Sequence, residues 1–272
     1  MAAAVLPACV LADSVSALGA DAVDVVIVTG SHGGRVAGAM AIRAGVHAAI
    51  FNDAGIGLRG AGIAGLSLFE QCGLAAAAVD CHSARIGEAA STLRGRISVV
   101  NAVGETLGVR PGMVASDAAC LIAGTFSGTN DIAIPEERRV RLDDLRPDVL
   151  LLDSASMVGK SDAGAIVVTG SHGGMVGGAS GYAIKLPVRA AVFNDAGMGM
   201  GRAGTARLAA LDAMGIPAAT VSAASAAIGD ARSTYDEGRL SAVNHEAALI
   251  GAAPGMDCAD FVALARDALR RT

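Results

Sequence analysis

The sequence contains the same series of motifs twice, about 140 residues apart. VTGSHGG at 28–34 recurs without change at 168–174, and FNDAGIG at 51–57 recurs as FNDAGMG at 193–199. Three further pairs keep the same order: VLADSVSALG at 10–19 with LLLDSASMVG at 150–159, AGIAGL at 61–66 with AGTARL at 203–208, and SARIGEAAST at 83–92 with SAAIGDARST at 225–234. Self-similarity at a fixed spacing indicates two copies of one unit. We therefore expect an internal duplication.

The repeat positions predict the domain boundaries. We place a first α/β repeat at 1–123, a linker or edge segment at 124–144, and a second repeat with a C-terminal helix at 145–272. The middle segment contains turn-forming residues and the charged run EERRVR at 136–141, which we interpret as solvated surface. The apolar N-terminus lacks the positively charged start of a signal peptide, and residues 10–19 match the second copy, so we expect it to belong to the fold.

Within each copy, short apolar runs alternate with Ala-rich segments. In the first copy, residues 23–30, 46–55 and 74–83 have the apolar composition of buried parallel strands, while 35–45 and 62–73 have helical composition. This alternation predicts an α/β fold with four or five parallel strands in each copy. We expect Rossmann-like or flavodoxin-like halves related by a pseudo-twofold axis.

Composition excludes several classes of partner. The chain has 21 Lys and Arg against 26 Asp and Glu, a net charge of −5, no Trp and two Tyr. A nucleic-acid site needs clustered cations and aromatic stacking surfaces, so we expect no nucleic-acid partner. No apolar run reaches the roughly 18–20 residues of a membrane span, so we expect no membrane partner.

The five cysteines indicate a reducing environment. They are scattered along the chain and form no C-x-x-C pair, at Cys9, Cys72, Cys81, Cys120 and Cys258. This pattern is typical of reduced thiols rather than of a disulfide framework or a zinc site. We therefore expect a cytoplasmic protein. We also expect a homo-oligomer that uses no cofactor, with a divalent metal as the lesser alternative.

The GSHGG loops are the most specific candidate site. Ligands of parallel α/β sheets bind at the carboxyl ends of the strands, and there the first copy places Ser31 and His32 among three glycines, Gly30, Gly33 and Gly34. The second copy places Ser171 and His172 beside Gly173 and Gly174. Three interpretations stay open: glycine amides that bind an anion or carbonyl oxygen, a nucleophile elbow carrying a catalytic Ser, or a structural tight turn. An activated Ser would need a base from elsewhere, since an adjacent His points away.

A second group of polar residues closes the next strand of each copy. Asn52 and Asp53 correspond to Asn194 and Asp195. Asn and Asp favour turns, which is one interpretation. In the other, Asp53 or Asp195 orients a His or acts as a general base, or joins Asp13 in binding a hard metal.

The two copies differ in charge near the third strand. The first has Arg35, Asp80, Cys81, His82 and Arg85 where the second has Met175, Ser222, Ala223, Ala224 and Ala227. We expect His82 to act as a base and Arg85 to bind a carboxylate, with Ser83, Ser225 and the second copy's Lys160 as further substrate contacts. Cys81 is interpreted as a packed side chain rather than a nucleophile.

These features favour an enzyme that acts on a small polar or anionic metabolite. The leading hypothesis is hydrolysis of an amide-like C–N bond, with Ser and His groups at the strand ends and glycine amides as oxyanion donors. One alternative is an isomerase or racemase with proton transfer from two sides. Another is a non-catalytic domain that binds a small anion. The low aromatic content argues against a large hydrophobic ligand.

Overall fold

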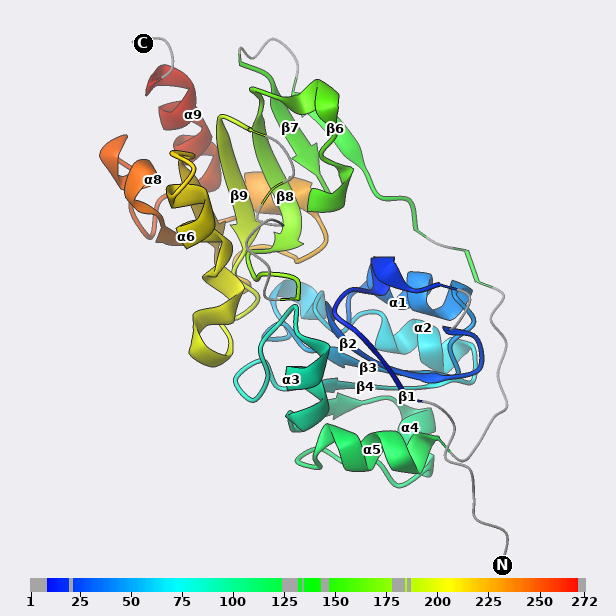
Figure 1. Cartoon of the computed structure of the whole chain (residues 1–272). Helices are drawn as coiled ribbons and strands as arrows, with labels where there is room; N and C mark the ends of the chain where they lie inside the picture. The colour runs from blue at the N-terminus through cyan, green and yellow to red at the C-terminus, as the bar shows by residue number, and fades with distance from the viewer. Residues whose placement is uncertain are drawn as a thin grey trace, which may run out of the picture. The chain divides into compact units, whose positions relative to one another are not determined.

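The computed structural model describes residues 9–19, 22–123, 132–133, 135–142, 147–177, 184 and 187–268. The chain forms two compact units: unit 1 is Met1–Gly55 with Ala61–Pro135, and unit 2 is Ile56–Gly60 with Glu136–Thr272. Each unit holds one sheet flanked by helices (Figure 1), which confirms the α/β class.

The sheet of unit 1 has its strands in the order of the sequence. Strands β1 (Cys9–Ala12), β2 (Val26–His32), β3 (Ala48–Asn52) and β4 (Ala75–Val79) are mutually parallel, and β5 (Ile97–Val100) pairs antiparallel with β4. All five residues of β3 and of β4 are buried. Helices cover both faces of this sheet, so its central strands are apolar on both sides.

The helices of unit 1 divide between those two faces (Figure 1). The layer on one face packs Phe51 and Phe69 together with residues of α1 and α2, and the layer on the other packs Val28 and Ile50 with residues of α5. The helical elements of unit 1 are η1 (Val15–Ala17), α1 (Arg35–Arg43), α2 (Leu66–Gln71), α3 (Ala89–Arg94), α4 (Ala102–Thr106) and α5 (Ala115–Ile122). The short η3 (Leu58–Gly60) belongs to the segment that is grouped with unit 2.

Unit 2 has a sheet with the order β11-β10-β9-β8-β7-β6. The inner pairs are parallel, while the edge strands β6 and β11 are antiparallel to their neighbours. The strands are β6 (Arg139–Leu142), β7 (Val149–Leu152), β8 (Ile166–His172), β9 (Ala190–Asn194), β10 (Ala218–Val221) and β11 (Leu240–Val243).

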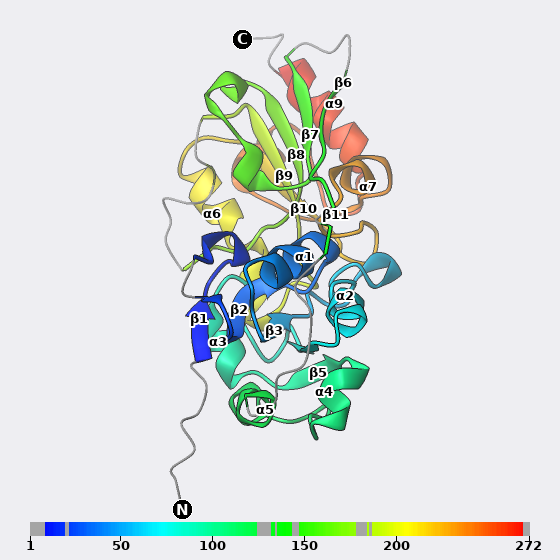
Figure 2. The ribbon, with the colours of Figure 1, turned by 90° about the vertical axis from the view of Figure 1, so that its right-hand side faces the viewer.

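Helices also cover both faces of the second sheet, as Figure 2 shows for α6 on one side and α7 and α9 on the other. Phe193 packs with Leu208 and Leu211 of α6, whereas Phe261 of α9 packs in the opposite layer. The helical elements are η4 (Ala155–Met157), η5 (Lys160–Asp162), η7 (Met200–Thr205), α6 (Arg207–Asp212), α7 (Ala231–Asp236), α8 (His245–Leu249) and α9 (Cys258–Ala268).

The topology departs from the expected one in two ways. The strands expected to be parallel include antiparallel ones: β5 and β11 run against β4 and β10 after connections that contain α3 and α7, and β6 runs against β7. The sequential order also differs from the Rossmann order 3-2-1-4-5-6 and the flavodoxin order 2-1-3-4-5, and it has no point of reversal that would form a ligand crevice. Residues 175–187, which follow the second GSHGG motif, lie largely outside the described residues.

The charged run EERRVR was interpreted as solvated surface in a linker or edge segment, and all of its residues except Val140 are exposed. Part of the run forms β6, the edge of the second sheet. Arg138 forms ion pairs with both Asp153 (3.0 Å) and Asp230 (2.8 Å), and Arg139 pairs with the buried Asp162. None of the helices in the described ranges is long and apolar enough to cross a membrane.

Candidate functional site

Ser31 and Ser171 lie inside strands, not on the tight turn of a nucleophile elbow. Ser31 is in β2, where the register with β3 shifts between Val28 and His32, and Ser171 is in β8. The Oγ of Ser31 accepts a hydrogen bond from the amide of Val15 (3.0 Å), and that of Ser171 accepts one from the amide of Ala155 (2.8 Å). Each serine therefore ties its strand to the 3-10 turn beside it.

The amides expected to bind an anion are already hydrogen bonded within the protein. The amide of Ser31 donates to Thr29 Oγ1 (3.1 Å), that of Gly33 to the carbonyl of Asn52 (3.0 Å), and that of Gly34 to His32 Nδ1 (3.1 Å). In unit 2, the amides of Gly173 and Gly174 donate to the carbonyl of Asn194 and to His172 Nδ1, respectively. The structure thus gives these amides a role in holding the loop.

Close backbone contact explains the glycine before each serine. The amide of Gly87 donates to the carbonyl of Gly30 (2.8 Å), and a Cβ on Gly30 would lie 2.5 Å from the Gly87 carbonyl carbon. In unit 2, a Cβ on Gly170 would lie 2.5 Å from the amide of Asp230. Only glycine permits this approach.

His32 is held as a neutral imidazole. Its Nδ1 accepts the amide of Gly34, so this nitrogen carries no proton. Burial lowers the pKa of His32 to about 4. At neutral pH, only Nε2 of this ring carries a proton, and the ring contributes no charge to the site.

Asn52 and Asn194 connect neighbouring loops. Asn52 Nδ2 donates to the carbonyl of Ala84 (3.3 Å), and its Oδ1 accepts the amide of Ala54 (2.9 Å). Asn194 makes the same pair of contacts with Ala226 and Ala196. Both side chains are fully buried, and these hydrogen bonds satisfy their polar atoms.

Asp53 is a buried carboxylate at the carboxyl end of β3. Its Oδ1 accepts the amides of Gly55 and Cys81, each at 2.9 Å, and its Oδ2 accepts the hydroxyl of Ser98 (2.8 Å). The Oδ1 of Asp195 accepts the corresponding two amides, those of Gly197 and Ala223. The Ser98 contact distinguishes the first unit, because Ser241 of β11 bonds to Thr220 instead.

Backbone strain follows these aspartates. Ala54 and Ile56 have φ values of 50° and 62°, and Ala196 and Met198 have values of 49° and 65°. Positive φ is uncommon for residues other than glycine, and a β-branched residue such as Ile56 pays the greater cost. Such strain clusters at functional sites, so these loops are candidates for contact with a ligand.

Three chemically reactive side chains converge after β4. The ligand atoms of Asp80, Cys81 and His82 all lie within 4.8 Å of one another; Cys81 is buried and His82 is exposed. Asp80 Oδ1 accepts the amide of His82 (2.9 Å). Burial, followed by the charges of Asp53 and Asp80, raises the pKa of the Cys81 thiol to about 12, so the thiol is protonated at neutral pH.

The other expected contacts of this region are engaged in the protein. Arg85 Nε pairs with Glu88 (2.7 Å), and Ser83 Oγ donates to the carbonyl of Asp80 (2.8 Å), as Ser225 does to that of Ser222 (2.9 Å). Lys160 is exposed in η5, just before β8 begins, so the structure does not place it with the residues at the strand ends of unit 2.

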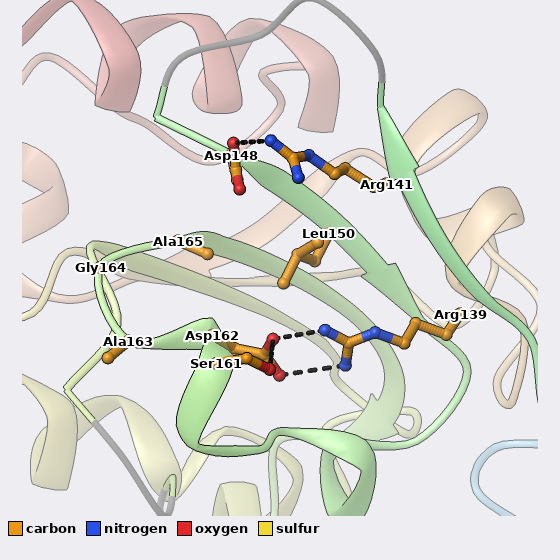
Figure 3. Close-up of a pocket in the computed structure, with 9 residues that line it drawn as sticks. All are labelled: Arg139, Arg141, Asp148, Leu150, Ser161, Asp162, Ala163, Gly164 and Ala165. Atoms are coloured by element: carbon orange, nitrogen blue, oxygen red, sulfur yellow. Dashed lines mark hydrogen bonds and ion pairs between the residues drawn. The ribbon is translucent and has the colours of Figure 1, made fainter.

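A cavity of about 250 Å³ lies elsewhere in unit 2, where β7 and β8 begin (Figure 3). Arg139 binds Asp162 through two nitrogens, and Arg141 binds Asp148 (2.7 Å). The cavity is lined by Arg139, Arg141, Asp148, Leu150, Ser161, Asp162, Ala163, Gly164 and Ala165. None of the residues expected at the strand ends lines it.

The sequence analysis missed two features. Arg207 is buried, donates from Nε to the carbonyl of Gly174 (2.9 Å) and lies 5.1 Å from the ring centroid of Phe193; burial lowers its pKa to about 10. No sequence pattern indicates burial of a single Arg. The convergence of Asp80 with Cys81 and His82 could have been anticipated from the D-C-H triplet alone.

The chain matches no protein-family model, no curated protein and no solved structure. What the fold and the site define is a class: an α/β protein with a buried carboxylate and an Asp-Cys-His cluster at the carboxyl ends of β3 and β4.

Proposed function

We propose that this protein is an enzyme that hydrolyses an amide-like C–N bond of a small polar or anionic molecule. The observation that carries the proposal is the convergence of Asp80 and His82 beside Cys81, whose amide is held by the buried Asp53. A carboxylate near an imidazole at a strand end is the arrangement that general-base catalysis uses.

In the proposed reaction, His82 takes a proton from the nucleophile as the nucleophile attacks the carbonyl carbon. The imidazolium then returns that proton to the departing nitrogen, and the carboxylate of Asp80 stabilises the positive charge in between. The nucleophile is water. The alternative nucleophile is the hydroxyl of Ser31, which lies in β2, two strands away from β4, and would need a base other than His82. The Ser31 oxygen accepts a hydrogen bond from Val15, which leaves the hydroxyl proton available for transfer to a base.

A panel of small amides and related C–N compounds tests the proposal. Once a substrate is found, His82→Ala should lower kcat/KM by about 100-fold or more, and His245→Ala, which removes an exposed histidine from α8, is the matched control. Ser31→Ala separates the two nucleophiles, since it abolishes turnover only if Ser31 attacks. Solvent deuterium exchanged into an unhydrolysed substrate would instead indicate the isomerase, and binding without turnover would indicate the anion-binding domain.

We also propose that the two units arose by internal duplication and that the enzyme is a cytoplasmic homo-oligomer. Supporting the duplication, Asp13 and Asp153 each accept the first amide of a helix, from Ala89 and Ala231, and the Asn and Asp contacts described above recur in both units. The scattered cysteines support a reducing compartment. Sedimentation equilibrium of the purified chain tests the oligomeric state.

A further inference from the structure

We propose that Asp80, Cys81 and His82 form a binding site for a borderline transition-metal ion such as Zn²⁺. The inference goes beyond the proposed hydrolysis and gives the same side chains a different role, because a His82 that binds an ion cannot also take the proton of the nucleophile. Metal binding is measured without substrate, so its failure and the failure of the hydrolysis are distinguishable. The inference rests on the side chains that converge after β4 and on a comparison with the same turn in unit 2.

The three ligand atoms have the separation that one ion requires. They lie within 4.8 Å of one another, and tetrahedral zinc with bonds of about 2.0 Å to N or O and about 2.3 Å to S brings its ligand atoms to about 3–4 Å apart. Side-chain rotations would bring the three ligand atoms from their present separations to those that a bound zinc ion requires. A thiolate together with an imidazole and a carboxylate favours zinc or cobalt over magnesium or calcium, which prefer oxygen ligands alone.

The turn is held in place by hydrogen bonds that leave ligand atoms available. Asp80 Oδ1 accepts the amide of His82, so its second oxygen can bind the ion. Asp53 Oδ1 accepts the amide of Cys81 and its Oδ2 accepts Ser98, which provides an outer shell behind the cysteine. Arg96, whose amide adjoins the turn, directs its guanidinium to the carbonyl of Gly112 (3.1 Å).

The fold itself does not require these three residues. After β10 the same turn is built from Ser222, Ala223 and Ala224: the amide of Ala224 donates to Ser222 Oγ (3.2 Å), and that of Ala223 donates to Asp195 (2.9 Å). Since Ser-Ala-Ala suffices for the turn, the acid, the thiol and the imidazole of unit 1 serve another purpose. Three protein ligands leave one position for water, which is typical of catalytic zinc.

Metal binding has a defined proton balance. The Cys81 thiol loses its proton as the sulfur–metal bond forms, and the proton passes to the buffer. The ion enters from the side of the exposed His82, while the buried Cys81 closes the inner side.

Cobalt titration of the full-length, untagged and metal-stripped chain tests the site. We expect one Co²⁺ per chain, with a thiolate-to-cobalt charge-transfer band in the near ultraviolet that Zn²⁺ displaces. The combined variant Asp80→Ser, Cys81→Ala and His82→Ala recreates the Ser-Ala-Ala turn and should lose the band. Each single change should weaken binding by more than about tenfold, the least that loss of an outer-shell partner causes.

Cys120→Ser is the matched control, because Cys120 is an exposed cysteine of α5, and it should keep the band. Circular dichroism establishes that each variant is folded. The proposal is overturned if the wild-type chain gives no charge-transfer band, or if the band survives in the folded triple variant. The wild-type titration needs no variant, so it still tests the proposal if a variant fails to fold.

Discussion

The carbonyl oxygen of Gly30 accepts a hydrogen bond of 2.8 Å from the amide of Gly87, and this contact joins β2 to the segment that leads into α3. Gly170 and Gly229 form the same contact in unit 2, at 2.7 Å. Two backbones meet here without side chains between them, so the glycines that point to a ligand loop in the sequence have a packing role.

Gly30→Ala is therefore expected to destabilise the fold. A Cβ at this position would lie 2.5 Å from the Gly87 carbonyl carbon and 2.8 Å from the Asp13 carbonyl oxygen, and backbone atoms cannot move aside as a flexible side chain does. We expect a loss of at least about 2 kcal/mol in the free energy of unfolding, measured by urea denaturation. Gly159→Ala is the control, because its Cβ would meet only Asp162 Oδ2 at 3.9 Å. Equal stability of the two variants would contradict the packing role.

The half-buried His32 predicts a dependence of stability on pH. Its pKa is about 4 in the folded chain and 6.5 in the unfolded chain, so the unfolded state binds more protons between these values. The stabilisation is complete above pH 6.5 and is lost as the pH falls through 4, by up to about 3 kcal/mol. His32→Asn keeps an acceptor for the amide of Gly34 but does not titrate. Urea denaturation at pH 7 and pH 5 should show a smaller change for the variant, and identical changes would refute the assignment.

The two arginines of the unit 2 cavity are predicted to differ in importance (Figure 3). Arg139 binds Asp162, whose side chain is 1% exposed, and hydrogen bonding from Arg139 lowers the pKa of Asp162. Arg139→Ala leaves this carboxylate buried without its partner, and we expect a loss of about 2–3 kcal/mol in the free energy of unfolding at neutral pH. Arg141→Ala breaks only the exposed pair with Asp148, so we expect a loss below about 1 kcal/mol.

The pH dependence of the Arg139 variant follows from the same pair. Because the folded pKa of Asp162 is lowered, its stabilisation is present above the unfolded value of 3.8 and disappears as the pH falls through the folded pKa. The stability difference between wild type and Arg139→Ala should therefore shrink in acid. A difference that stays constant down to the acid transition would show that the ion pair is not its source.

Asp53 is predicted to serve both fold and reaction. Asp53→Asn keeps an oxygen for the amides of Gly55 and Cys81 but removes the negative charge, so we expect a folded protein with kcat/KM reduced by about 100-fold. Asp53→Ala also leaves those buried amides without an acceptor, and we expect it to lose about 2–3 kcal/mol of stability. Full activity of folded Asp53→Asn would place the carboxylate outside the reaction.

The α/β class and the positions of most elements were predictable. Parallel strands covered on both faces read as continuous apolar runs, which identified β2, β3 and β4 from the alternation along the chain. Strand direction was not predictable, since the residues of β5 and β11 have the same composition whichever way they run. The sequential strand order depends on where each crossover connection places the next strand in the sheet, and no local residue pattern indicates that position.

The sequence by itself determined the fold class, the paired polar motifs and the contrast between Asp80-Cys81-His82 and Ser222-Ala223-Ala224, because these are properties of residue type and spacing. The tertiary structure decided what the motifs do. It showed the amides of Gly33 and Gly34 already bonded, Gly30 in contact with Gly87, and Asp53 buried against Cys81. The same glycine-rich segment can hold a ligand or another part of its own backbone, and only the partners brought together by folding distinguish the two.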